Sequence, residues 1–165
     1  MVRLIALFAA LIAWLWFAEP EPVDLWIGLP FVVAGTALRL WAAGHLEKTT
    51  RLITSGPYAY TRNPMYLGRL LIFVGLAFAA RLPNGWHWIL MALGLAIFFF
   101  YYMPRKERVE GARLLDVHGE AYGRYRTGVP PLFPRTSRWT NAERRAWCTG
   151  SLIENRELWM TLGVL

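Results

Sequence analysis

An arginine and an asparagine placed ahead of a proline are the first candidates for binding chemistry. Arg62 and Asn63 precede Pro64, which has no backbone N–H and suits the first turn of a helix. The dipeptide Gly56-Pro57 marks a turn in the loop that leads to them. At a helix N-terminus, unpaired N–H groups and the helix dipole favour an anionic group. The pattern therefore predicts a site for a carboxylate or a similar anion. The ordinary alternative is an interfacial loop with an aromatic belt.

Two carboxylates and two tyrosines form a second candidate group further along the chain. Glu107 and Glu110 are three residues apart and share one face of a helix expected over 105–127, as do Tyr122 and Tyr125. Carboxylates suit ammonium and hydroxyl groups, and the aromatic rings can pack on a planar or cationic ligand. The ordinary alternative is a solvated helix whose acids and bases pair at i, i+4.

The elements that position these residues are expected to be membrane helices. Hydrophobic residues make up 56% of the 165 residues and charged residues only 18%, which is too much apolar surface for a soluble core of this size. A bilayer core of about 30 Å requires about 20 apolar residues in a helix. Four stretches come close to that length: 2–18, 23–43, 65–81 and 86–103. We therefore predict an all-α membrane protein with about four transmembrane helices and a cytoplasmic C-terminal helical segment.

Basic residues predict the orientation of these helices. The connection between residues 44 and 64 and the segment that begins at Arg105 are rich in Lys and Arg, and such segments face the cytoplasm. Arg3 places the N-terminus on the same side. We therefore expect a multi-pass integral membrane protein with both termini in the cytoplasm. The first stretch is kept as an anchor, because a signal-peptidase site after Ala18 would place Trp16 where a small residue is required.

Several chemistries are excluded by what the sequence lacks. It contains no Rossmann glycine motif, phosphate-binding loop, zincin motif or nucleophile elbow. The three histidines, His45, His87 and His118, lie on different segments without metal-ligand spacing, and Cys148 is the single cysteine. We therefore predict no metal site. The net charge of +7 is attributed to the flanks of the spans and to anionic lipids, so no nucleic-acid partner is expected.

Two arginines lie inside the apolar stretches. Arg39 and Arg69 are each about five residues from the cytoplasmic end of their span. A charge within the membrane is a functional-site hypothesis by default, but a side chain this close to the interface can also reach the headgroups. Both interpretations are left open by the sequence.

The order and spacing of the two candidate groups resemble those of a known enzyme family. The relevant motifs are Arg62-Asn63-Pro64-Met65-Tyr66-Leu67-Gly68, Glu107-x-x-Glu110, His118-Gly119-x-x-Tyr122-x-x-Tyr125 and Val129-Pro130. Together, between about residues 44 and 134, they resemble the superfamily of isoprenylcysteine carboxyl methyltransferases and phospholipid methyltransferases. Asn63 stands where many members carry His, and His118 where Phe is common.

The resemblance implies an integral-membrane methyltransferase that uses S-adenosylmethionine, with the cofactor enclosed by the ends of the last two spans and the cytoplasmic C-terminal segment. The cofactor shell that it implies comprises Gly56, Pro57, Tyr58, Arg62, Asn63, Pro64, Tyr66, Gly68, Glu107, Glu110, Tyr122 and Tyr125. Within this shell, Arg62 or the helix N-terminus suits the carboxylate of the cofactor, and Glu107 or Glu110 suits its ammonium and ribose hydroxyls.

The acceptor is expected to be lipophilic and to reach the site from the cytoplasmic leaflet. Arg39 and Arg69 are the candidate substrate-binding residues, because each could pair with a carboxylate or phosphate on such a molecule. Arg69, Glu107 and Glu110 are the candidate catalytic residues, the two glutamates as bases if the acceptor is an amine. An isoprenylcysteine-like thiol acid and a phospholipid amine both remain open, and membrane lipids are the expected surroundings.

Two other function classes are kept as alternatives. One is an NADPH-dependent membrane reductase of the steroid-reductase type, and the other is a non-catalytic membrane scaffold. The tail over 135–165 lies outside the methyltransferase domain predicted for 1–134. Its Thr140-Asn141-Ala142-Glu143 matches a capping box, which predicts an interfacial amphipathic helix. That helix could cover the cofactor site or contact a second copy of the chain.

Overall fold

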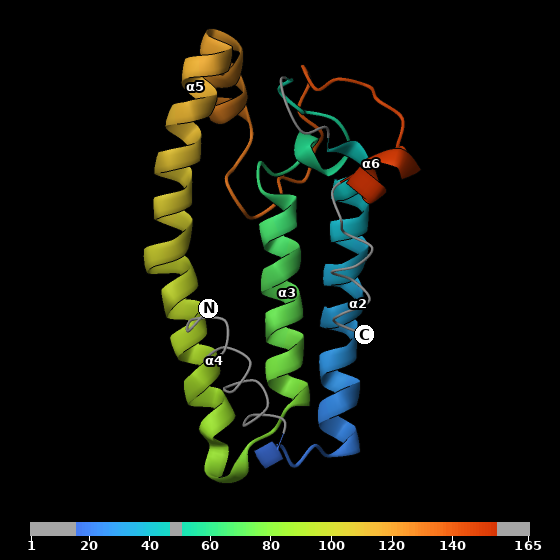
Figure 1. Cartoon of the computed structure of the whole chain (residues 1–165), viewed down its shortest axis with the longest axis vertical. Coiled ribbons are helices and arrows are strands. Elements are labelled where there is room, and N and C mark those ends of the chain that lie inside the picture. Colours follow the sequence, from blue (N-terminus) through green and yellow to red (C-terminus); the bar gives the residue numbers. More distant parts are fainter. Residues whose placement is uncertain (1–15, 47–50, 155–165) are drawn as a thin grey trace.

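The computed structural model describes residues 16–46 and 51–154, and all regular structure in these ranges is helical. This confirms the all-α class for the described part of the chain. The elements are α2 (Pro22–His45), η1 (Gly56–Ala59), α3 (Pro64–Ala79), η2 (Pro83–Gly85), α4 (Trp86–Ala96), η3 (Ile97–Tyr102), α5 (Met103–Gly128) and α6 (Thr149–Glu154). Three helical columns stand side by side, formed by α2, by α3 and by α4 continued into α5 (Figure 1). Of the predicted span 2–18, only residues 16–18 are described.

Prolines begin the first two columns. Pro22 and Pro64 each occupy the first turn of a helix, as expected for a residue without a backbone N–H. The bounds of α2 and α3 lie within two residues of the predicted spans 23–43 and 65–81. At 16 residues, α3 is about 24 Å long, which is shorter than a typical bilayer core.

Glycines allow α2 and α3 to pack closely. A Cβ atom on Gly35 of α2 would lie 2.6 Å from the carbonyl oxygen of Gly68, and one on Gly75 of α3 would lie 2.7 Å from that of Gly28. Within each helix the two glycines, Gly28 and Gly35 in α2 and Gly68 and Gly75 in α3, are seven residues apart. Both therefore lie on the face that meets the neighbouring helix. Small residues at such positions let helix backbones approach in a membrane protein. The α2–α3 pair is therefore the most closely packed part of the helical assembly.

The third column is one long helix with two irregularities. The predicted span 86–103 and the predicted cytoplasmic helix 105–127 are not separate elements, because α4, η3 and α5 follow one another without a loop. Pro104 cannot donate a backbone hydrogen bond, and the π-helical η3 directly precedes it. The wider turn accommodates the proline without ending the helix. The second irregularity is at Gly119, where φ 50° and ψ −129° are not helical, so that α5 consists of two helical segments joined by a kink.

Two helices of the described chain are long and apolar enough to cross a membrane, namely α2 and the column that contains α4. Their outer faces carry exposed apolar side chains, such as Trp26 at 74% and Phe100 at 86% exposure. Such faces are suited to contact lipid. The prediction of four spans, with both termini in the cytoplasm, stays a prediction.

The connecting segments gather at one end of the columns, where α2 ends and α3 begins (Figure 1). The capping box predicted at residues 140–143 is wrong, because residues 142–148 are irregular and the next helix is the six-residue α6. Glu143 instead donates its backbone N–H to Thr54 and pairs its carboxylate with Arg51, both at 3.0 Å. The predicted interfacial helix further along the tail lies largely outside the described residues.

Candidate functional site

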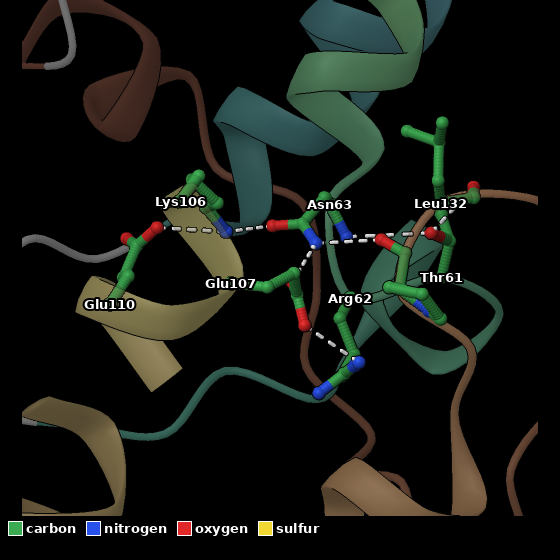
Figure 2. Close-up of polar contacts among 8 residues, drawn as sticks. Thr61, Arg62, Asn63, Lys106, Glu107, Glu110 and Leu132 are labelled. Atoms are coloured by element: carbon green, nitrogen blue, oxygen red, sulfur yellow. Dashed lines mark hydrogen bonds and ion pairs between the residues drawn. The ribbon is translucent and has the colours of Figure 1, made fainter. Parts of the chain in front are cut away.

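Arg62 and Glu107 join the segment before α3 to the long helix. Nη2 of Arg62 lies 2.8 Å from Oε2 of Glu107, and the Arg62 side chain is only 9% exposed (Figure 2). Its backbone N–H donates to the carbonyl oxygen of Pro130 at 2.9 Å. A buried ion pair with this geometry holds the guanidinium in one orientation. Arg62 is thus fixed both by its backbone and by its side chain.

Asn63 connects three segments through one amide group. Its Nδ2 donates to Oε1 of Glu107 at 2.7 Å and to the carbonyl oxygen of Pro131 at 2.6 Å. Its Oδ1 accepts from Nζ of Lys106, which also pairs with Glu110 at 2.8 Å (Figure 2). Both carboxylate oxygens of Glu107 therefore have partners, one on Arg62 and one on Asn63.

The segment after α5 is hydrogen-bonded to the loop that precedes α3. Thr61 Oγ1 donates to the carbonyl oxygen of Leu132 at 2.8 Å. The backbone N–H groups of Arg135 and Trp139 donate to the carbonyl oxygens of Tyr60 and Ala59, each at 3.0 Å. Residues 130–139, which the sequence marked only by its Val-Pro dipeptide, thus form part of the scaffold of the site.

The two tyrosines at the end of α5 are buried together. Tyr122 and Tyr125 are each 3% exposed, and their ring centroids lie 6.4 Å apart. The hydroxyl of Tyr125 donates to the carbonyl oxygen of Tyr58 at 2.8 Å. Burial raises the pKa of Tyr125 well above its usual value, so the phenol stays neutral and remains a donor.

A cavity of about 510 Å³ lies between the long helix and the loop before α3, in the size range of small-molecule sites. It is lined by Leu46, Arg51, Leu52, Ile53, Tyr58, Arg62, Lys106, Glu110, Arg113, Leu114, Val117, His118 and Tyr125. Basic and acidic groups thus stand beside aliphatic and aromatic walls. This mixture suits a ligand that carries both charges and an apolar part.

Arg62 lines this cavity and has unused hydrogen-bond donors. Its Nε and Nη1 are buried and have no hydrogen-bond partner within the described part of the chain. Only Nη2 is engaged, by Glu107. Buried donors without a partner cost about 1–3 kcal/mol, more for a charged group, and are an arrangement that a bound anion would satisfy. The anion site at the N-terminus of α3 stays a prediction, with which these unused donors agree.

Four residues of the predicted cofactor shell line the cavity: Tyr58, Arg62, Glu110 and Tyr125. Glu107 and Asn63 do not line it. Glu107 instead pairs with Arg62, and Asn63 is hydrogen-bonded to Glu107 and Lys106. Tyr122 packs behind the cavity beside Gly111.

Other members of the predicted shell have packing roles in the structure. Gly56 has φ 57°, and any Cβ atom there would collide with the His45 ring. Pro57 is fully buried, and its carbonyl oxygen closes the η1 turn. Gly68 lies at the α2–α3 contact, where a Cβ atom would be 2.6 Å from Cγ of Arg39. These residues shape the loop and the helix pair without lining the cavity.

The candidate acceptor residues lie outside the cavity. Arg39 is 6% exposed and packs against α3 at Gly68, so it does not extend to solvent. Arg69 is exposed, with its guanidinium carbon 5.2 Å from the centroid of the Tyr66 ring. Nζ of Lys106 lies 4.9 Å from the same centroid. Tyr66 therefore connects Arg69 to the polar network through Lys106.

Sequence reasoning missed Lys106, Arg51 and Arg113 as residues of the cavity. Lys106 and Glu110 have the i, i+4 spacing that predicts an ion pair, and this was the available signal. No local signal exists for Arg51, which reaches the cavity from the loop after α2. The part of the chain that the structure describes has no group of three or more potential metal ligands.

A known protein family matches the region of the chain that contains much of this site. The family model for phospholipid methyltransferase matches residues 23–114, which is more than half of the chain. The protein therefore belongs to the phospholipid methyltransferase family, whose members are membrane enzymes, and its apolar helices agree with a location in the membrane.

Three curated proteins have sequences similar to that of the chain. It is 33% identical to the protein-S-isoprenylcysteine O-methyltransferase of Schizosaccharomyces pombe, over 62% of this chain and 42% of that protein. It is 29% identical to the cobalt-zinc-cadmium resistance protein CzcN of Cupriavidus metallidurans, over 88% of this chain and 72% of the relative. It is 30% identical to the nickel-cobalt-cadmium resistance protein NccN of Alcaligenes xylosoxydans xylosoxydans, over 79% of this chain and 59% of that relative. No solved structure matches the chain significantly.

Proposed function

We propose that the protein is an S-adenosylmethionine-dependent methyltransferase that acts on a lipophilic acceptor at the cytoplasmic leaflet. The observation that carries this proposal is the guanidinium group of Arg62. Among the described residues, its Nε and Nη1 are buried without hydrogen-bond partners, and Arg62 lines a cavity of about 510 Å³ at the N-terminus of α3. Membership of a methyltransferase family supports the choice of cofactor.

The residues of the cavity fit the groups of S-adenosylmethionine. The unused donors of Arg62 suit a carboxylate, which accepts hydrogen bonds from a guanidinium. The half-exposed carboxylate of Glu110 suits an ammonium or ribose hydroxyl. Leu114, Val117 and the ring of Tyr125 provide apolar surface for a base. When bound, the cofactor supplies a methyl group activated by a positively charged sulfur.

The task of the chain is to hold both reactants in line and exclude water, because methyl transfer is a one-step displacement. Glu107 and Asn63 hold Arg62 in position, and Tyr125 anchors the backbone of Tyr58. An acceptor carboxylate is ionised at pH 7 and needs no base. An amine acceptor would need one, and Glu110 is then the better candidate because both oxygens of Glu107 are occupied.

For the acceptor, we propose an isoprenylcysteine-like thiol acid or an amino phospholipid that arrives from the bilayer. Arg69 is exposed on α3 and coupled to the site through Tyr66 and Lys106, so it can receive an anionic group on such a molecule. Arg69→Leu is expected to lower turnover with little change in cofactor affinity. Unchanged steady-state kinetics in this variant would remove Arg69 from the proposal.

Calorimetric titration of the detergent-purified chain tests the cofactor. We expect S-adenosylmethionine and S-adenosylhomocysteine to bind, and Arg62→Lys to weaken both by about tenfold or more through loss of the guanidinium donors. Arg108→Gln, which removes an exposed charge that does not line the cavity, is the matched control. Its affinity should remain within a factor of about two of the unmodified chain.

The same titration separates the alternatives. Binding of NADPH without either adenosyl ligand would replace the proposal with a membrane reductase. If a folded sample binds none of the three ligands, a non-catalytic scaffold is favoured. Equal weakening by Arg62→Lys and Arg108→Gln would show that the binding is not specific to this cavity.

A further inference from the structure

A second cavity is lined by Gly56 and Tyr60, whereas Tyr58 of the same loop lines the first. It has a volume of about 420 Å³ and is formed by the end of α2, the turn and the tail after residue 137. None of the residues that line it also lines the cavity of Arg62. Five of its lining residues belong to the tail, for which the sequence motifs predicted no function. The proposal for this cavity does not depend on the proposed methyl transfer.

Three arginines line this cavity: Arg138, Arg144 and Arg145. The single carboxylate among the lining residues belongs to Glu143, and it already pairs with Arg51 at 3.0 Å. Arginines therefore outnumber carboxylates among the described residues that line this cavity. Guanidinium groups form paired hydrogen bonds to phosphate oxygens, which makes a phosphate group the fitting ligand.

The backbone around these arginines is held in place by the rest of the fold. Nη2 of Arg138 donates to the carbonyl oxygens of Ala142 and Glu143, at 3.2 and 2.6 Å. The backbone N–H of Glu143 donates to Thr54 Oγ1 at 3.0 Å. The turn that presents Arg144 is thus fixed at its base before any ligand binds, which reduces the entropy cost of binding.

Aromatic residues place this cavity at the level of the membrane surface. Trp41 and Tyr60 form one wall, with ring centroids 6.5 Å apart. Trp147, 46% exposed, donates its indole N–H to the carbonyl oxygen of Leu40 at 3.2 Å, so the tail is fastened to the last turns of α2. Tryptophan and tyrosine at the end of an apolar helix are typical of the headgroup region.

We propose that this cavity is a phosphate-binding site, filled by the phosphate of an anionic lipid headgroup or by free phosphate. The bound group offsets the positive charge of the lining residues and holds the tail against α2. Cationic residues near a membrane surface each contribute about 1 kcal/mol to the attraction of anionic lipid. The wall formed by Trp41 and Tyr60 accommodates the part of the headgroup next to the phosphate.

Binding of soluble ligands to the detergent-purified full chain tests the proposal. The probes are dihexanoyl phosphatidylglycerol and inorganic phosphate, each titrated at constant ionic strength and followed by calorimetry. We expect saturable binding of at least one, and a loss of about tenfold in the Arg144→Gln/Arg145→Gln variant. The control with the same net charge is Arg108→Gln/Arg126→Gln, whose exposed arginines line neither cavity.

The outcomes of these titrations are distinct. Binding of the lipid alone identifies a headgroup as the source, and binding of inorganic phosphate identifies the free ion. Absence of saturable binding by both probes overturns the proposal, as does an equal loss in both double variants. An unchanged thermal transition verifies that the first variant is folded. If it is not, Arg144→Gln alone, at an exposed position, decides the question by the same criterion.

Discussion

At the scale of single residues, Asn63 connects several segments of the chain in addition to preceding the first turn of α3. Its side chain makes no capping hydrogen bond to α3. It instead contacts Lys106, Glu107 and the carbonyl oxygen of Pro131. An imidazole is thus not needed for this position to join the loop to the long helix.

We predict that Asn63→Ala lowers the free energy of unfolding by about 1–3 kcal/mol, because it leaves buried hydrogen-bonding groups without partners. Asn63→Asp should be at least as destabilising, since it places a carboxylate beside Glu107. Thermal unfolding in detergent, compared with an Arg108→Gln control, measures both. A transition unchanged in Asn63→Ala would contradict the contacts described for this amide.

At the scale of elements, the α2–α3 pair depends on glycines that allow the backbones to meet. A Cβ atom on Gly68 would lie 2.6 Å from Cγ of Arg39 and 2.8 Å from the carbonyl oxygen of Gly35. The backbone oxygen cannot move away without separating the helices. Gly123 on α5 has no atom within 4 Å of the equivalent position and is its natural control.

Gly68→Ala is predicted to destabilise the protein by about 1–3 kcal/mol through overpacking. Gly123→Ala should be neutral or stabilising by up to about 1 kcal/mol, because alanine loses less backbone freedom in a helix. Both values follow from thermal or denaturant unfolding of the purified variants. Equal effects in the two variants would mean that close packing at Gly68 does not stabilise the helix pair.

At the scale of the whole molecule, both cavities lie at the end of the helical columns where Cys148 is also found. Cys148 is exposed and is the single cysteine of the sequence. Its backbone N–H donates to the carbonyl oxygen of Gly44, the residue before the end of α2. The turn that contains Asn84 lies at the opposite end of the columns (Figure 1).

The expected orientation predicts that a membrane-impermeant maleimide labels Cys148 from the cytoplasmic side only. Inside-out vesicles should be labelled and sealed right-side-out vesicles should not. The variant Cys148→Ser/Asn84→Cys should show the reverse pattern. Labelling of Cys148 in right-side-out vesicles would invert the predicted topology and place both cavities on the outer side.

Much of the local structure was predictable because it depends on short-range properties of the chain. Pro64 begins α3, Gly119 interrupts α5, and the apolar runs become α2, α3 and α4, since proline geometry, glycine freedom and hydrophobicity act within a few residues. The fusion of the fourth span with the following helix was not predicted. It depends on the π-helical turn before Pro104.

By itself, the sequence determined the helical class, the apolar segments and the family motif, because these follow from composition and regular spacing. Only the tertiary structure decided which motif residues line the cavity. Glu107 and Glu110 are equivalent by spacing, but Arg62 and Asn63 occupy both oxygens of Glu107 and leave Glu110 at the cavity. That choice depends on contacts across more than forty residues, which no local pattern encodes.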